Sequence, residues 1–328
     1  LSLRGARRGL VAAAQSLRAQ SRRGLFGSAL LVWGRSLSRG DGRIPVPTRI
    51  PVPKRIPVPA RARHPHRRLG LRLGSEHRRL GWAVCAYFTL GGALHDAAIA
   101  AWSHKGWYDY IRPVSALRWM QGRGQCTDPN LPNFDATGLP LVPGFCEMVT
   151  PGDLDFPSPA DVDKLKVRAW RGPEYIDNPA TDEAGVDWIL AEQWWPYQRP
   201  SFVTPPFAGY VSGHSTFSRA AAEVMTAITG DAFFPGGLGE FVAPADDFLV
   251  FEEGPSQDIV LQWATYRDAS DQCSLSRIWG GIHPPCDDLP GRRIGLEVAE
   301  HALNLAFDLI EAHAVCAADL NGDGTLWK

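Results

Sequence analysis

Three stretches of the chain carry side chains that could bind an anion and move protons. The first is KGWYDYIRP, in which Lys105 and Arg112 lie seven positions apart. On a helix, seven residues make almost two turns, so we expect both cations on one helix face. Two cations among alanine and tryptophan residues need an anion, and Trp102 and Trp107 beside them argue against the alternative of a solvated basic patch.

The second stretch, FAGYVSGHSTFSR, places Ser212, Gly213 and His214 directly before a predicted helix at 215–229. A helix N-terminus offers unpaired backbone N–H groups and partial positive charge, and the N–H of glycine can approach an oxyanion closely. Ser212 adds a hydroxyl, and His214 can exchange a proton near neutral pH. Alone, such a histidine is more commonly a buried structural residue, because Ser-Gly-His also occurs by chance.

The third stretch, SRIWGGIHPPCDD, supplies a third cation, a second histidine and a carboxylate: Arg277, His283 and Asp287. Gly280 and Gly281 would let the chain curl before the histidine. Asp287 could accept a hydrogen bond from His283, which would fix its tautomer and make the other ring nitrogen a better nucleophile or metal ligand. The alternative for His283 alone is a satisfied core histidine.

Together the three stretches form a more specific pattern than any one of them. Three cations, two histidines, a glycine N–H at a helix start and an orienting carboxylate make a site for a tetrahedral oxyanion. The spacing of Ser, Arg, His and Asp in the third stretch alone is roughly a one-in-a-thousand coincidence at average residue frequencies.

The pattern Lys-x6-Arg-Pro, Ser-Gly-His and Ser-Arg-x5-His-x3-Asp resembles the superfamily of type 2 phosphatidic acid phosphatases and vanadium-dependent haloperoxidases. The resemblance covers about residues 82–312. It implies that vanadate or phosphate is the bound oxyanion. The resemblance implies that Lys105, Arg112 and Arg277 would neutralise the equatorial oxygens of the anion. Ser212 and the N–H of Gly213 would be the remaining groups that bind it.

The resemblance gives the histidines two possible roles. In a haloperoxidase, His283 would bind vanadium as the axial ligand, and His214 would act as acid–base, with Lys105 or His214 polarising the peroxide. In a phosphatase, His283 would attack phosphorus and His214 would protonate the leaving group. Asp287 would orient His283 in both cases.

Two aromatic residues favour the haloperoxidase. Trp102 and Phe207 have the offsets of the aromatic residues that line the halide side of fungal chloroperoxidases, whereas algal bromoperoxidases place a histidine at the position of Phe207. Plain core packing is the alternative for both. The context of the motifs is similar to bacterial haloperoxidase-like proteins, and the absence of a run of about 18 apolar residues argues against the membrane branch.

Hydrophobic periodicity predicts a mainly α fold, a helical bundle of the haloperoxidase and type 2 acid phosphatase kind with long loops. We expect helices at 82–120 with a break at Pro113, and at 181–195, 215–229, 255–273 and 292–314; residues 121–165 are loop-like. In the last helix, one stripe of side chains should face the core: Ile294, Val298, Ala302, Leu305 and Leu309. No alternating strand pattern stands out.

We place the helical domain at 81–315. One segment before it and one segment after it lie outside this domain. Residues 1–80 hold 19 of the 34 Lys and Arg residues but two of the 35 acids, so the rest carries a net charge of −18. Three tandem RIPVP repeats predict extended, disordered or non-native chain, with nucleic-acid binding as the weaker alternative. Residues 316–328 look like a truncated calcium loop (Asp319, Asn321, Asp323, Gly324) that ends before its position-12 acid, so we expect no calcium site.

The sequence therefore predicts a vanadate-dependent haloperoxidase that uses hydrogen peroxide, a halide and an organic acceptor, with a soluble acid phosphatase as the alternative. We expect no membrane insertion, since the short apolar run at 25–34 cannot span a bilayer, and no nucleic-acid partner. The tail hints weakly at an exported protein. The six cysteines form no C-x-x-C pair, and disulfides 126–146 or 273–286 and free thiols remain open. Halide, organic substrate and oligomeric state are not readable.

Overall fold

The computed structural model describes residues 75–319, with side chains described from 81 to 311. The RIPVP repeats, most of the basic leader and the calcium-loop residues Asn321, Asp323 and Gly324 lie outside the described residues. The first helix within the described residues, α3, begins at Ser75, six residues before the domain boundary expected from the sequence. The mainly helical fold is confirmed.

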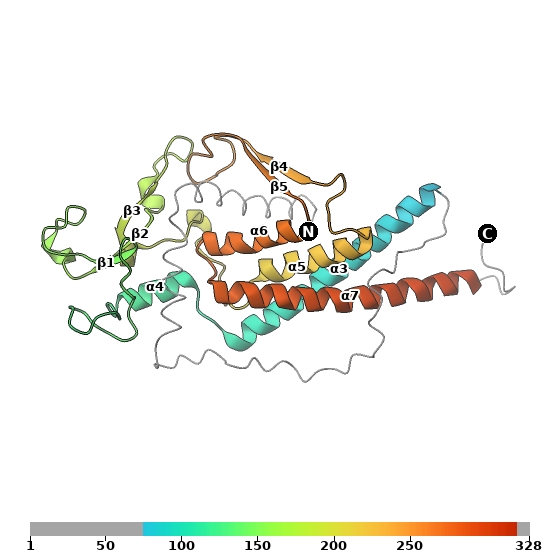
Figure 1. Cartoon of the computed structure of the whole chain (residues 1–328), viewed down its shortest axis with the longest axis horizontal. Coiled ribbons are helices and arrows are strands. Elements are labelled where there is room, and N and C mark those ends of the chain that lie inside the picture. The colour runs from blue at the N-terminus through green and yellow to red at the C-terminus, as the bar shows by residue number, and fades with distance from the viewer. Residues whose placement is uncertain (1–74, 320–328) are drawn as a thin grey trace.

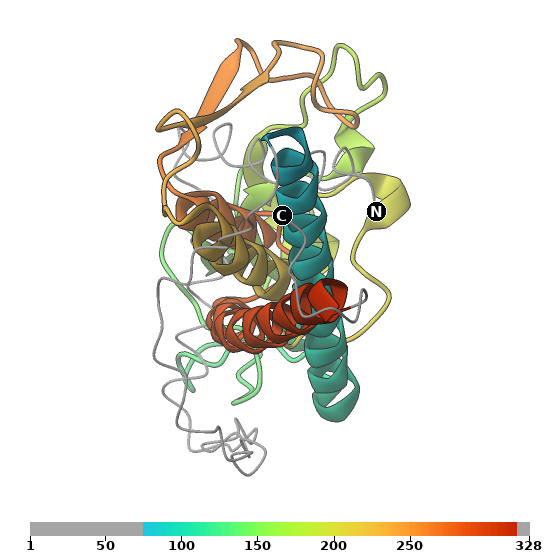
Figure 2. The same ribbon diagram turned by 90° about the vertical axis from the view of Figure 1, so that its right-hand side faces the viewer.

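Four long helices form the body of the molecule (Figures 1 and 2). They are α3 (Ser75–Tyr108), α5 (Gly213–Thr229), α6 (Tyr266–Trp279) and α7 (Pro285–Asp319). Helix α5 is central, because it contacts the other three. Its amphipathic sequence begins at the N-cap Ser212 and ends at Gly230, whose left-handed conformation (φ 73°) suits glycine.

Small residues let these helices approach closely. The core between α3, α5 and α7 consists mainly of alanine, with Val224 and Ile228 as its larger members: Ala86, Ala93, Ala97, Ala220, Ala299 and Ala302. A Cβ atom on Gly291 of α7 would lie 2.8 Å from the Ser212 carbonyl oxygen, and one on Gly295 would collide with the Thr216 carbonyl. The two glycines therefore allow α7 to pack against the first turns of α5.

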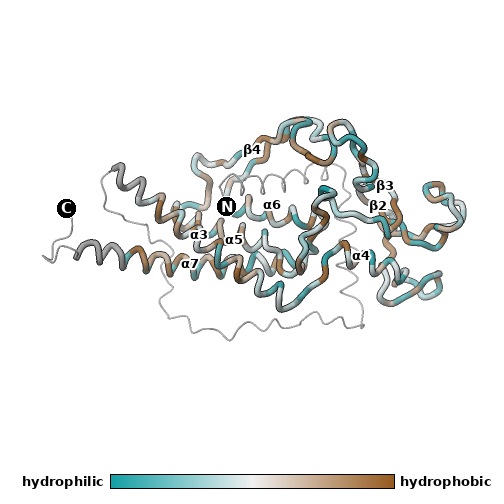
Figure 3. The backbone as a smooth tube through the Cα atoms, turned by 180° about the vertical axis from the view of Figure 1, so that it is seen from behind, coloured by the Kyte–Doolittle hydropathy of each residue, from teal (hydrophilic) through white to brown (hydrophobic). Residues whose placement is uncertain are grey.

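The larger apolar side chains of α3 face outward, among them Val84, Tyr87, Phe88 and Ile99. Figure 3 shows hydrophobic segments along both α3 and α7. By length and composition, the stretch Gly81–Gln121 contains one helix that could cross a membrane, and 22% of its most apolar window is buried. A single such helix is weak evidence, so the absence of membrane insertion stays a prediction.

The expected stripe on the last helix is partly wrong. Ala302 is buried, but Leu305 and Leu309 are 58% and 49% exposed. The buried positions are instead Ala299, Ala302 and Ala306. The stripe is rotated toward the small residues because only they fit the close packing against α3 and α5.

Two small sheets, absent from the sequence prediction, flank the bundle (Figure 1). One is antiparallel with the order β1 (Cys146–Met148), β2 (Leu165–Trp170), β3 (Val186–Leu190) and packs on helix α4 (Pro113–Gln121). The other pairs β4 (Gly239–Ala243) with β5 (Ile259–Trp263). Short 3-10 turns connect these parts: Pro159–Asp161, Pro173–Tyr175, Ala191–Gln193 and Pro200–Phe202.

Two predicted helices are corrected by these sheets. The segment 181–195 forms β3 and a 3-10 turn, because Gly185 has a positive φ of 71° and the following residues pair with β2. In the segment 255–273, β5 comes first and α6 begins after Thr265. Thr265 and Asp268 form a capping box there, which fixes the start of α6. The helices expected at 82–120, 215–229 and 292–314 are confirmed, with the expected break before Pro113.

Candidate active site

Lys105 and Arg112 meet, although not on one helix as the sequence predicted. Helix α3 ends at Tyr108, and Arg112 is the extended N-cap of α4 (φ −83°, ψ 151°). Both side chains are almost fully buried, at 3% and 5% exposure. The polypeptide turns between them, so the two cations approach the same partner from different elements rather than from one helix face.

That shared partner is the backbone at 207–209, which precedes α5. Nζ of Lys105 donates to the carbonyl oxygens of Ala208 (3.0 Å) and Gly209 (2.7 Å). Nε and Nη2 of Arg112 donate to the carbonyls of Phe207 (2.9 Å) and Ala208 (3.2 Å). These bonds fix both cations through backbone carbonyls, and no acidic side chain forms an ion pair with either of them in the described part of the chain.

His283 has the tautomer that an oxyanion ligand or nucleophile requires. Its Nδ1 lies 2.6 Å from Oδ2 of Asp287, and its Nε2 lies 3.0 Å from Nη1 of Arg112. A guanidinium can only donate, so Nε2 is the acceptor and Nδ1 carries the proton to Asp287. The predicted orientation of His283 by Asp287 is therefore present in the structure.

The glycine pair before His283 makes this arrangement possible. Gly281 has a φ of 72°, and a Cβ atom there would lie 3.1 Å from the ring of Trp194. The tight turn at 280–281 leads from α6 into α7, and the N–H of His283 donates to the Arg277 carbonyl at 3.2 Å. The turn thus brings the end of α6 and the start of α7 to the same cluster, as the sequence predicted.

Ser212, Gly213 and His214 lie at the start of α5. The backbone N–H of Ser212 donates to the Asp287 carbonyl at 2.9 Å, which joins this stretch to the His283 pair. Ser212 is fully buried and caps the helix, and His214 is half-buried in its first turn. Burial, followed by the nearby charges of Arg277, Lys105 and Arg112, lowers the pKa of His214 to about 3. His214 is therefore neutral until an anion arrives.

The cluster is strongly electropositive. Burial, then the neighbouring Arg112, lowers the pKa of Lys105 to about 7. Burial also lowers the pKa of both arginines, Arg112 and Arg277, to about 10. Asp287 compensates them only in part, because burial raises its pKa to about 7. Three cations thus face one another with little compensation, an arrangement that favours anion binding.

A tetrahedral oxyanion such as vanadate or phosphate fits this donor set. Nε of Arg277 is buried and has no hydrogen-bond partner, so one donor is left over for a ligand. The acceptor nitrogen of His283 lies at the same cluster. Among the side chains that the structure describes, no group of three or more His, Cys, Asp or Glu residues could hold a cation.

The predicted halide residues lie against the cations. The rings of Trp102 and Phe207 are 5.2 Å apart, and both are about 40% exposed. Nζ of Lys105 lies 5.6 Å from the Trp102 ring and 5.4 Å from the Phe207 ring, and the Arg112 guanidinium lies 5.3 Å from Phe207. The aromatic pair therefore covers the cations from one side and opens to solvent on the other.

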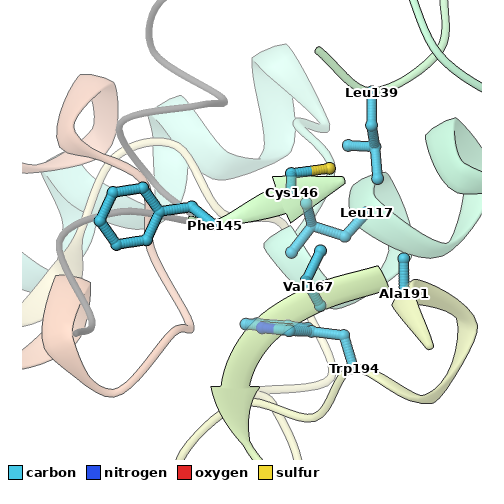
Figure 4. A pocket seen from close by; sticks show the side chains of 7 residues that line it. All are labelled: Leu117, Leu139, Phe145, Cys146, Val167, Ala191 and Trp194. Atoms are coloured by element: carbon cyan, nitrogen blue, oxygen red, sulfur yellow. The ribbon is translucent and has the colours of Figure 1, made fainter. Parts of the chain in front are cut away.

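A small apolar cavity lies elsewhere, in the β1–β3 lobe (Figure 4). None of the residues of the cluster lines it. Its walls are apolar side chains of the lobe's own core: Leu117, Leu139, Phe145, Cys146, Val167, Ala191 and Trp194. It is a packing gap without polar groups that could orient a ligand.

The sequence prediction missed three features of the site. The carbonyls of 207–209 hold two cations, and Gly209 is needed because a Cβ atom there would lie 2.9 Å from Asp287 Oδ2. The second aspartate of the doublet, Asp288, is also buried, and it accepts from Ser215 at 2.8 Å. The doublet itself was the available signal. The five cysteines whose side chains are described form no disulfide, so the alternative disulfides 126–146 and 273–286 are not formed in this structure.

Comparison with known proteins matches residues 85–312 to the family model of the VCPO second helical-bundle domain. Three solved structures are similar to this chain. A holo-type bacterial vanadium-dependent chloroperoxidase is 21% identical, with a TM-score of 0.46, and the match covers 66% of this chain and 34% of that one. An apo-type bacterial vanadium-dependent chloroperoxidase is 20% identical, with a TM-score of 0.48, and the match covers 73% of this chain and 38% of that one. A bacterial vanadium-dependent iodoperoxidase is 28% identical (0.25, 35% and 24%). This chain thus spans about a third of the two chloroperoxidases. No curated protein matches.

Proposed function

This chain belongs to the vanadium-dependent haloperoxidase family, because residues 85–312 match the model of that family's second helical-bundle domain. On that premise we propose that it is a vanadate-dependent haloperoxidase. The proposed reaction oxidises a halide with hydrogen peroxide to hypohalous acid; bromide is the expected halide, and chloride is the alternative. An organic acceptor then receives the halogen. Vanadate, when bound, supplies the Lewis-acidic centre that activates hydrogen peroxide toward halide attack.

One observation carries this proposal. The acceptor nitrogen of His283 lies in a buried group of three cations, one of which, Arg277, has a buried Nε without a partner. Such a group stabilises a multiply charged oxyanion and withdraws electron density from it. The same charges hold His214 neutral in the free site.

The residues of the chain divide the work as follows. Lys105, Arg112 and Arg277 would hold the oxyanion, together with the N–H of Gly213. His283 would hold it through Nε2, while Asp287 accepts the hydrogen bond from its Nδ1.

Proton transfer falls to the other histidine. Once an anion offsets the cations, the pKa of His214 should rise, so that this side chain would take up and return a proton beside the bound oxyanion. The aromatic side, Trp102 and Phe207, excludes water from the cations and admits the halide.

The test combines metal analysis with an activity assay. Protein incubated with vanadate should retain about one vanadium per chain and brominate a phenol dye with peroxide and bromide at mildly acidic pH. The variant His283→Ala should do neither. Absence of bromination together with brisk phosphatase activity would replace the proposal by its alternative.

That alternative, a soluble acid phosphatase, is supported by the same tautomer of His283. A neutral imidazole whose Nδ1–H is held by a carboxylate is also a suitable nucleophile toward phosphorus. A phosphatase would give a trapped phosphohistidine at His283 and competitive inhibition by vanadate. Export of the protein and the absence of a nucleic-acid partner remain predictions.

A further inference from the structure

The carboxylate that orients His283 has a second partner on its other oxygen. Oδ2 of Asp287 accepts from Nδ1 of His283 at 2.6 Å, while Oδ1 accepts from the thiol of Cys286, whose Sγ lies 3.7 Å away. Asp287 is fully buried, and among the described residues no other group donates to Oδ1. A buried carboxylate oxygen without a donor is costly, so even the weak S–H donor of Cys286 stabilises it.

The thiol of Cys286 is itself held by Tyr110. Burial, followed by the charge of Asp287, raises the pKa of this thiol to about 12, so it carries its proton near neutral pH. The phenol hydroxyl of Tyr110 forms a hydrogen bond with Cys286. Since Cys286 gives its proton to the carboxylate, its sulfur is the acceptor here and Tyr110 is the donor. Three hydrogen bonds therefore connect Tyr110 to His283 through Cys286 and Asp287.

Tyr110 is anchored to the segment that binds the cations. Its carbonyl oxygen accepts the N–H of Gly209 at 2.9 Å, and the Gly209 carbonyl accepts from Lys105 at 2.7 Å. Gly209 also lies directly against Asp287, because a Cβ atom on this glycine would be 2.9 Å from Oδ2. The hydrogen bonds that reach His283 through Nδ1 are therefore fixed relative to the cations of the site.

We propose that Cys286 is a positioning residue of the oxyanion site: its thiol holds the Asp287 carboxylate in the orientation in which Oδ2 meets Nδ1 of His283, and thereby keeps Nε2 directed at the anion. This inference rests on the proposed function of the site. The side-chain torsion that turns an aspartate carboxylate has a broad energy minimum, so one hydrogen bond restricts it only weakly. Bonds to both oxygens restrict it much more, and the imidazole ring is restricted with it.

Loss of the thiol should weaken anion binding and leave the halide side unchanged. The partner of a ligating histidine contributes roughly tenfold to a hundredfold to affinity, and a residue that acts through this partner should contribute less. We expect vanadate affinity to fall about fivefold, the effect of one ordinary hydrogen bond. The KM for bromide should not change, because the thiol acts on His283 and not on the aromatic pair Trp102 and Phe207.

Two measurements on the full chain test the inference. Low-field proton NMR of the anion-free protein reports the Nδ1 proton of His283, and His283→Ala identifies this resonance by its absence. In Cys286→Ala the resonance should move upfield or broaden, and isothermal titration should show the loss of vanadate affinity of about fivefold. Cys286→Ser restores a donor at the same carbon and should recover most of both readouts, which a merely structural role of Cys286 does not predict. If Cys286→Ala folds poorly, Tyr110→Phe removes the hydroxyl that holds the thiol and should act in the same direction.

Cys85→Ala is the matched control. Cys85 is another cysteine of the described chain, and it lies in the first half of α3, whereas Lys105 lies in the last turn of that helix. Its Nδ1–H resonance and vanadate affinity should equal those of the unaltered protein. The inference is wrong, and the proposed function survives, if Cys286→Ala keeps the resonance or the vanadate affinity of the unaltered protein, or if Cys286→Ser loses as much as Cys286→Ala. If the unaltered protein does not bind vanadate, the proposed function itself fails.

Discussion

Nη1 of Arg112 lies 3.0 Å from Nε2 of His283, so the nitrogen assigned to the oxyanion is covered by a cation of the same site. Nη1 also donates to the Ile282 carbonyl at 2.9 Å. A ligand that bonds to Nε2 must therefore displace one guanidinium contact, while the bonds of Arg112 to Phe207 and Ala208 can persist. Arg112 thus covers the acceptor nitrogen and would donate to the oxyanion once that contact is displaced.

Replacement of His283 by alanine should abolish vanadium retention and bromination, because it removes the acceptor nitrogen that lies beside Arg112 and is oriented through Asp287. Elemental analysis after desalting measures the first and dye bromination the second. His301→Ala is the control, since His301 is an exposed histidine on α7, the helix that follows His283. Equal vanadium content in both variants would exclude His283 as the ligand.

Replacement of Arg277 by methionine should stabilise the anion-free protein. Arg277 is half-buried with an unpartnered Nε, and its charge helps to lower the pKa of Lys105. Removal of an uncompensated buried charge should raise the free energy of unfolding by about 1–3 kcal/mol. The variant should also lose the rise in melting temperature that vanadate causes. Arg293→Met, at an exposed position, should change neither quantity, and a destabilised Arg277→Met protein would contradict the idea of a strained cation group.

The stability of the anion-free protein should depend on pH through Lys105. Its pKa falls from 10.5 to about 7 on folding. Between these values the unfolded chain binds a proton that the folded chain does not, so stability from this group rises with pH above about 7. The free energy of unfolding of the unaltered protein should therefore rise by about 1–2 kcal/mol relative to that of Lys105→Met between pH 7 and pH 9. Urea unfolding at both pH values measures it, and a constant difference would mean that Lys105 stays charged.

Phe207→Ala should impair oxidation more than vanadate binding. The ring covers Lys105 and Arg112, and without it water would hydrate both cations and weaken their pull on the bound oxyanion. We expect kcat/KM for bromide to fall about tenfold, the size of one or two cation–π contacts, with vanadate affinity changed less than threefold. Phe202→Ala, at another exposed phenylalanine, serves as the control. Loss of vanadate affinity alone would assign Phe207 to the oxyanion rather than the halide.

The motif residues could be predicted from the sequence because their chemistry is local. The four-residue spacing of His283 and Asp287 and the N-cap at Ser212 depend only on the geometry of one turn. The meeting of Lys105 and Arg112 was also predicted, but for the wrong reason. Their common partner is the backbone at 207–209, almost a hundred positions away, and no side-chain pattern encodes a carbonyl.

The small sheets were missed for a similar reason. Strand β5 (Ile259–Trp263) is short and directly followed by α6, so its apolar residues look like the first turn of the helix. Only the pairing with β4 distinguishes them. The stripe on α7 was misplaced because hydrophobicity alone ranks leucine above alanine, while the close packing of this bundle selects for size.

Gly291 and Gly295 have a consequence for how this site can change. They lie one turn apart on α7, each against a backbone carbonyl of α5. Contact through backbone leaves no flexible side chain that could absorb a small displacement. A displacement of α7 relative to α5 would therefore carry Asp287 and Asp288 away from their partners together. The histidine and the serine of the anion site are thus coupled mechanically by two residues that have no side chain at all.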